Sequence, residues 1–162
     1  MEIFACGTSW NASLIGKHLL EQLAGISTTV SYASEARYAP CPLRENTLII
    51  GVTQSGETAD TLAALGMEQQ RRLDKAVNFT SRFLGITNRV ESSITNLVDE
   101  VIDIRAGIEI GVAATKTFIA QVMVFYFLAI DLAWQRQYLS GERIREITVS
   151  YTHLTLPTML WV

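Results

Sequence analysis

Three hydroxyl side chains lie within six residues around a single glycine. Thr53, Ser55 and Thr58 surround Gly56 in a polar segment that follows an apolar run. Hydroxyl groups donate to oxygen acceptors, and a glycine lets backbone N–H groups approach a ligand closely. One helix N-cap uses only one such hydroxyl, so three exceed what capping needs. The segment therefore favours binding of a phosphate or a polyhydroxylated molecule, although N-capping remains an alternative for each hydroxyl.

Two other turns also combine glycine with small hydroxyl side chains. Residues 6–9 read Cys-Gly-Thr-Ser, and residues 107–116 form a glycine-bounded loop that ends at Lys116. Lys116 either neutralises a phosphate or is solvated, and both interpretations stay open. Glu57 is favoured by the dipole of the helix that it begins but would repel a phosphate, which favours an orienting role for it.

Elements that alternate along the chain must position these turns. Apolar, β-branched runs predict strands over residues 3–6, 28–32, 47–53, 83–87 and 99–104. Helical spacing predicts a helix that ends at Gly25 and further helices over residues 59–73, 114–135 and 141–148. Strands that alternate with helices predict an α/β fold with a mostly parallel sheet. Ligands of such sheets collect at the carboxyl ends of the strands, where these polar turns lie.

Composition narrows the class of protein. The 162 residues, 49% of them hydrophobic, suffice for one domain with a core and exclude disorder. A net charge of -3 disfavours a broad nucleic-acid interface. The uncharged run over residues 117–130 is shorter than a bilayer span, so we expect a buried core helix and no membrane partner.

Cofactor and targeting signals are missing from the sequence. Cys6 and Cys41 lie far apart and outside any metal-ligand spacing, so we expect reduced thiols and no metal. Neither GxGxxG nor GxxxxGK[ST] occurs, which disfavours a nucleotide, and we expect no cofactor. Glu2 interrupts any signal-peptide pattern, so we expect a cytoplasmic location.

The last segment differs from the rest in composition. Residues 149–162 carry no formal charge and are rich in threonine. The segment is either a terminal strand or a tail foreign to the domain. We therefore predict one domain over residues 1–148 and an atypical tail over residues 149–162.

Three motifs in order carry a resemblance to a known family. They are residues 5–11 (ACGTSWN), 54–61 (QSGETADT) and 109–116 (EIGVAATK). The second motif marks sugar isomerase (SIS) domains in general. Together the three resemble the first SIS domain of the glucosamine-6-phosphate synthase family, the glutamine:fructose-6-phosphate amidotransferases, and the resemblance covers residues 3–147.

The resemblance implies a fold and a binding site. The expected fold is a doubly wound three-layer α/β/α sandwich with a five-stranded parallel sheet. The residues implied to contact fructose 6-phosphate or glucosamine 6-phosphate are Thr8, Ser9, Thr53, Gln54, Ser55, Thr58 and, through its backbone, Val112. Ser55 and Thr58 would lie on the phosphate. Thr53 and Ala114 stand where serine is common in the family, and the alanine loses a side-chain contact.

The resemblance also implies partners that this sequence does not contain. The family's catalytic residues lie in a second SIS domain, and its cysteine nucleophile lies in a glutaminase domain. We therefore expect no catalytic residue in this chain, a fragment that is inactive alone, and a homodimer formed through SIS domains. The alternative is a non-enzymatic SIS sensor domain of a sugar-phosphate-responsive regulator, and the flanking gene sequence would separate the two.

Overall fold

Five parallel strands form the centre of the molecule. The computed structural model describes residues 1–73, 75, 77–111 and 114–152. The strands are β1 (Glu2–Ala5), β2 (Thr29–Tyr32), β3 (Leu48–Thr53), β4 (Arg82–Thr87) and β5 (Glu100–Asp103). Their bounds differ by at most one residue from those predicted. The predicted five-stranded parallel sheet is confirmed.

The strand order explains where a ligand site can form. The order in the sheet is β2-β1-β3-β4-β5, so the chain moves one way from β1 to β2 and the other way from β3 onward. Adjacent crossovers then leave the sheet on opposite faces, which opens a crevice between the carboxyl ends of β1 and β3. Ala5 pairs with Val52 at this point, and the first two polar turns follow directly.

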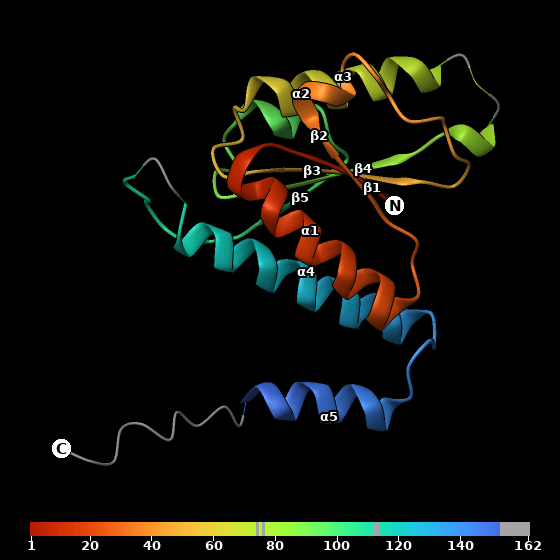
Figure 1. Cartoon of the computed structure of the whole chain (residues 1–162), viewed down its shortest axis with the longest axis vertical. Helices are drawn as coiled ribbons and strands as arrows, with labels where there is room; N and C mark the ends of the chain where they lie inside the picture. Colours follow the sequence, from red (N-terminus) through yellow and green to blue (C-terminus); the bar gives the residue numbers. More distant parts are fainter. Residues whose placement is uncertain (74, 76, 112–113, 153–162) are drawn as a thin grey trace.

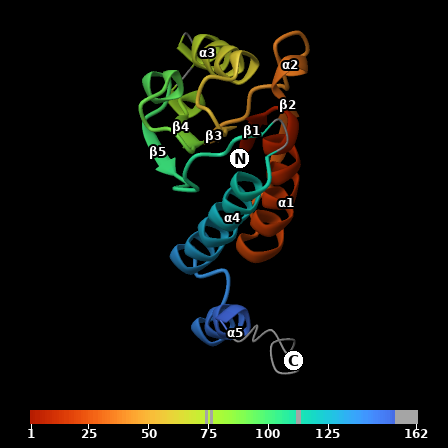
Figure 2. The same cartoon turned by 90° about the vertical axis from the view of Figure 1, so that its left-hand side faces the viewer.

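Helices cover both faces of the sheet. Helices α1 (Gly7–Ala24) and α4 (Lys116–Gln135) lie side by side on one face, and α2 (Ala33–Ala36) and α3 (Ala59–Leu73) lie on the other (Figures 1 and 2). The short 3-10 helices η1 (Val77–Phe79) and η2 (Ser93–Asn96) flank β4. The predicted doubly wound three-layer α/β/α arrangement is therefore confirmed.

Two apolar clusters fill the space between the layers, one on each face of the sheet. Ile3 and Ile50 face α1 and α4, while their strand neighbours Phe4 and Ile49 face α2 and α3. Successive strand residues point to opposite faces, so the unbroken apolar runs 3–5 in β1 and 48–52 in β3 suit a sheet that is covered on both sides.

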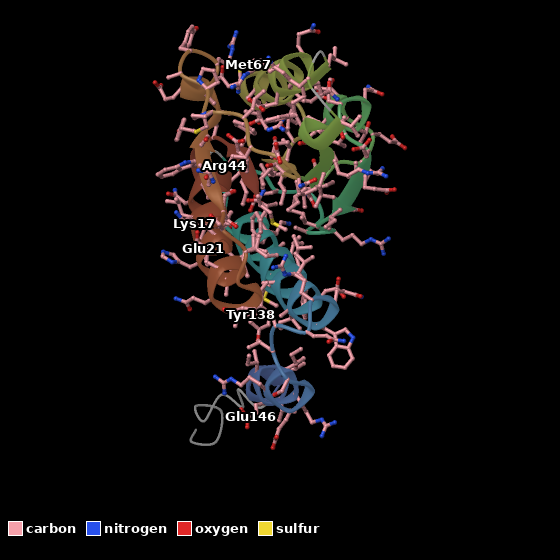
Figure 3. All side chains as sticks on the ribbon, turned by 90° about the vertical axis from the view of Figure 1, so that its right-hand side faces the viewer. Lys17, Glu21, Arg44, Met67, Tyr138 and Glu146 are labelled. Atoms are coloured by element: carbon pink, nitrogen blue, oxygen red, sulfur yellow. The ribbon has the colours of Figure 1, made fainter. Side chains whose placement is uncertain are left out.

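Gly25 ends α1 as predicted. Its φ of 62° is left-handed, and its N–H donates to the Leu20 carbonyl. A Cβ at this position would lie 2.4 Å from the Tyr138 ring, so a side chain has no room there. Figure 3 shows Tyr138 at this end of α1 and the half-buried pair Lys17 and Glu21 on its outer side, where the Lys17 Nζ lies 3.9 Å from the Glu21 Oε1. The contact joins the end of α1 to the segment that follows α4.

Helix α4 is only partly buried, which corrects the sequence expectation. Its buried residues recur every fourth position, at Thr117, Gln121, Phe125, Ala129 and Ala133. The opposite side exposes Ile119, Phe127 and Trp134 by more than half. With 20 residues and a mean hydropathy of 1.7, the helix is long and apolar enough to cross a membrane, because it extends beyond the uncharged run. Its buried stripe nevertheless gives it a place in the domain core, against α1.

Helix α5 (Gly141–Thr152) stands away from the sheet (Figures 1 and 2). The Tyr126 hydroxyl donates to the Ile147 carbonyl at 3.3 Å and so connects α4 to α5. Because α5 continues to Thr152, it passes the predicted domain boundary at residues 148–149. Residues 153–162 lie outside the described residues, and the division into domain and tail stays a prediction.

The basic run of Arg71 and Arg72, with Lys75 and Arg82, predicts the solvated face of a helix and its following loop, but the end of α3 is not such a face. Arg72 is 4% exposed, and its Nε donates to Oε2 of the fully buried Glu68 at 3.2 Å. Arg71 also donates to Glu68. A buried carboxylate requires such partners, because desolvation of an unpaired charge is costly. The pattern of like charges misled the sequence interpretation because the acid lies one helical turn earlier.

Candidate functional site

A cavity of about 180 Å³ opens at the carboxyl ends of β1 and β3. It is lined by Cys6, Thr8, Ser9, Gln54, Ser55, Thr58, Glu109, Gly111 and Ala114. These residues come from the three polar turns that the sequence singles out. The fold therefore brings together segments that lie about 50 residues apart along the chain.

The turn that joins β3 to α3, residues 53–58, holds its hydroxyls by internal hydrogen bonds. The Thr53 and Thr58 hydroxyl oxygens lie 2.7 Å apart, and the Glu57 N–H donates to the Ser55 hydroxyl at 3.1 Å. Gly56 lies in the left-handed region with φ of 69°. Thr53 is buried beneath Thr58 and does not line the cavity. These bonds orient the hydroxyls of Thr53, Ser55 and Thr58.

The connection between β4 and β5 supports this turn from behind. The Glu57 carboxylate accepts hydrogen bonds from the Ser93 N–H at 2.6 Å and the Ser93 hydroxyl at 2.7 Å. The Ile94 N–H donates to the Gly56 carbonyl at 3.1 Å. The bonds from Ser93 lower the pKa of Glu57, so its carboxylate stays charged. This contact agrees with the orienting role expected for Glu57.

Helix α1 presents its first turn to the cavity. Its N-cap, Cys6, makes no side-chain capping bond, so the Cys6 side chain does not offset the positive partial charge of the amides in the first turn. Ser9 is buried, and its hydroxyl accepts a hydrogen bond from the Gln121 amide of α4 at 3.0 Å. The Gly7 N–H donates to the Tyr32 hydroxyl at 3.1 Å. Tyr32 and Gln121 therefore hold the start of α1 and the Ser9 side chain in place.

The loop before α4 contributes the cavity's carboxylate. Oε1 of Glu109 accepts from the N–H groups of Thr115 and Lys116 at 2.9 and 3.0 Å, and Oε2 accepts from the Thr117 hydroxyl. These bonds, led by that of the Thr117 hydroxyl, lower the pKa of Glu109 to about 2. Glu109 thereby caps α4 from a distance. The Lys116 ammonium donates to the Ile108 carbonyl and does not line the cavity.

Replacing Glu109 with glutamine is expected to make stability less dependent on acid pH. The folded-state pKa of Glu109 is lowered from 4.5 to about 2, so its contribution is complete above pH 4.5 and is lost as the pH falls toward 2. The difference in unfolding free energy between wild type and Glu109→Gln should follow that course in urea titrations. Glu91→Gln, at an exposed carboxylate, is the matched control. A difference that is constant with pH would contradict the capping role.

The donor set suits binding more than covalent chemistry. Hydroxyls, an amide and helix N-termini surround the cavity, and Cys6 and Glu109 are its titratable lining residues. Within residues 1–73, 75, 77–111 and 114–152, no group of three or more His, Cys, Asp or Glu is placed to hold a metal ion. The arrangement can hold an anion and orient hydroxyl groups beside it.

The site contains most of the predicted residues and adds others. Thr8, Ser9, Gln54, Ser55 and Thr58 line the cavity, Thr53 supports Thr58, and Val112 lies outside the described residues. Their contact with a sugar phosphate stays a prediction. Sequence reasoning missed Gln121 and Ser93, whose contacts are distant in sequence, and assigned no role to Glu109. The single usable signal was the place of Glu109 in the third motif.

Two curated proteins with similar sequences are much longer than this chain. The glutamine–fructose-6-phosphate aminotransferase [isomerizing] of a Nostoc species is 66% identical over 91% of this chain, and that of a Synechocystis species is 63% identical over 95%. The chain spans about a quarter of their length, 24% in each case.

A solved structure and a family model agree with these similarities. The C-terminal domain of glucosamine-fructose-6-phosphate aminotransferase from Francisella tularensis matches with a TM-score of 0.82 and 33% identity, over 92% of this chain and 40% of that one. The model of the SIS domain family matches residues 1–131, which include the described parts of all three polar turns and the sheet that positions them. The chain therefore belongs to the SIS domain family.

Proposed function

We propose that this chain is the sugar-phosphate-binding part of a glutamine–fructose-6-phosphate aminotransferase. The observation that carries the proposal is the cavity at the β1 and β3 ends, where hydroxyls from two turns converge beside the starts of α1 and α3. The high identity to aminotransferases along nearly the whole chain supports the choice of enzyme. Fructose 6-phosphate and glucosamine 6-phosphate are the ligands proposed.

The proposed phosphate site is the 53–58 turn. The cavity lining contains no lysine or arginine among the described residues, so backbone amides, hydroxyls and helix dipoles supply the attraction. Ser55 and Thr58 lie at the start of α3, where the dipole favours a dianion. Glu109, on the opposite turn, repels an anion and accepts hydrogen bonds from hydroxyls. The phosphate therefore lies toward α3 and the sugar toward the third loop.

The reaction itself belongs to the proposal for the larger protein. The aminotransferases that the chain resembles are about four times as long, since the chain spans 24% of their length. We assign ammonia supply and the isomerisation residues to segments beyond this sequence, and a cytoplasmic location to the whole. The exposed side of α4, with Ile119, Phe127 and Trp134, is the surface proposed for homodimer formation.

The double substitution Ser55→Ala with Thr58→Ala tests the phosphate assignment. We expect the affinity for fructose 6-phosphate to fall at least ~100-fold, because each hydrogen bond to a charged group contributes about 1.5–3 kcal/mol. Isothermal titration calorimetry measures the affinity, and amide chemical shifts should locate the ligand at residues 54–58 in the wild type. Unphosphorylated fructose should bind much more weakly than fructose 6-phosphate.

Ser140→Ala with Thr148→Ala is the matched control, because it removes the same two hydroxyl types from the region of α5. It should keep wild-type affinity. Equal affinity in the site variant and the control would sink the assignment. Conversion of fructose 6-phosphate by the purified 162-residue chain would instead contradict the division of labour between this domain and the rest of the enzyme.

A further inference from the structure

We propose that Asn88 is a positioning residue that couples the phosphate-binding turn to the loop that holds the sugar. The inference rests on the proposed function, whose ligand it divides between two segments. Asn88 does not line the cavity, and none of the three sequence motifs contains it. Its place at the end of β4 nevertheless connects it to both segments.

The backbone of Asn88 holds the phosphate turn. Its N–H donates to the carbonyl of Gln54 at 3.1 Å, and Gln54 lines the cavity. The Thr87 hydroxyl adds a longer contact to the same carbonyl, at 3.4 Å. The end of β4 therefore fixes Gln54 through the main chain. This bond does not depend on the side chain at position 88.

The side chain of Asn88 holds the third loop. Its Nδ2 donates to the Gly107 carbonyl at 2.7 Å, and its Oδ1 accepts from the Ala106 N–H at 2.8 Å. The two partners determine the orientation of the amide, since an N–H can only donate and a carbonyl can only accept. Both contacts are short, so the side chain is bound to the loop on both of its polar atoms.

The contact continues the sheet where its backbone pairing stops. Thr87 and Asp103 form the last pair between β4 and β5, and the Ile104 N–H still donates to the Thr87 carbonyl at 2.9 Å. Beyond this point the Asn88 amide takes the place of a peptide group and pairs with Ala106 and Gly107. A planar group with one donor and one acceptor is required, which a side-chain amide supplies.

Ala106 and Gly107, which the Asn88 side chain holds, lead directly to the sugar side of the cavity. Gly107 has a φ of 70°, which turns the chain toward Ile108 and Glu109. The Glu109 carboxylate caps α4, and Lys116 donates to the Ile108 carbonyl. The described segment 106–109 is therefore anchored by Asn88 at one end and by the start of α4 at the other. Loss of the Asn88 amide would release residues 106 and 107 from the end of β4.

The test compares two ligands in the 162-residue chain. Inorganic phosphate reports on the 53–58 turn, whereas fructose 6-phosphate also requires the third loop. In Asn88→Asp, a second carboxylate oxygen faces the Gly107 carbonyl and repels it; Asn88→Ala removes both bonds. Both variants should bind fructose 6-phosphate about tenfold more weakly and phosphate within about twofold of wild type, because the backbone bond to Gln54 remains. Asn96→Asp, an exposed amide on η2, is the control and should leave both affinities unchanged.

Amide hydrogen exchange gives a second readout that needs no ligand. The Ala106 N–H should exchange faster in both variants, while amides of β1 and β3 keep their protection. An equal loss of affinity for both ligands, or an unchanged affinity for fructose 6-phosphate with unchanged exchange at Ala106, overturns the coupling role alone. Absence of fructose 6-phosphate binding in the wild type is a different result, since it overturns the proposed function and this inference with it.

Discussion

Replacing Gly56 with alanine is expected to abolish sugar-phosphate binding and to destabilise the fold by at least ~2 kcal/mol. A Cβ at this position would lie 1.8 Å from the Ser92 hydroxyl and 2.5 Å from the Ser92 Cβ. Its φ of 69° adds the steric cost of a left-handed conformation. The turn must therefore move, and the Ser55 and Thr58 hydroxyls move with it. Urea unfolding and titration with fructose 6-phosphate measure the two effects.

Gly66→Ala is the matched control for this substitution. Gly66 lies inside α3, and a Cβ there meets no atom within 4 Å. Alanine is the better helix former by about 0.8–1.0 kcal/mol, so this variant should be more stable than wild type and bind as wild type does. If both variants lost stability equally, the conformation described for the 53–58 turn would be wrong.

Phe125→Ala is expected to cost about 3–5 kcal/mol of unfolding free energy. The Phe125 ring is fully buried between α4, α1 and the sheet. It lies against Gly16, where an added Cβ would come within 2.4 Å of the ring, so the two helices approach as closely as this pair permits. Removal of the ring leaves a cavity that α1 cannot close. Because α1 carries Thr8 and Ser9, the affinity for the sugar phosphate should fall as well.

Phe127→Ala on the same helix is the comparison. Phe127 is 55% exposed and lies edge-on to Tyr126, with ring centroids 5.8 Å apart. Its loss should cost less than about 1 kcal/mol, in the range of surface substitutions and a single aromatic contact. Thermal unfolding of the two variants at equal concentration separates them. At concentrations too low for dimer formation, a Phe127→Ala effect as large as that of Phe125→Ala would contradict the packing of α4 through its Phe125 stripe.

The strands and the first two turns of the site were predictable because their signals are local. A mainly apolar run such as residues 47–53 predicts a strand that is covered on both faces of the sheet. A polar, glycine-containing turn that follows a parallel strand lies at the carboxyl edge of the sheet. The environment of α4 was less predictable. Its composition is apolar all round, so the pattern could not indicate that only the stripe through Phe125 is buried.

Charges and supporting residues depended on partners far away in the chain. Arg72 looked solvated among its basic neighbours, yet Glu68 and the backbone carbonyls of Arg44 and Phe79 bury it. The sequence left the role of Glu57 ambiguous, because its carboxylate accepts hydrogen bonds from Ser93, which lies 36 residues later. Such pairs have no periodicity, and no spacing rule connects their members.

The sequence by itself determined the alternation of strands and helices, the strand bounds to within one residue and the hydroxyl chemistry of the turns, since each follows from neighbouring residues and their period. The three-layer arrangement was implied only by the resemblance to SIS domains. The tertiary structure decided which turns meet. The reversal of strand order between β1 and β3 opens the crevice, and the β4–β5 connection brings Asn88 and Ser93 behind it. The hydroxyls are chosen locally, but their orientation comes from hydrogen bonds made across the sheet, which form only when all its strands are in place.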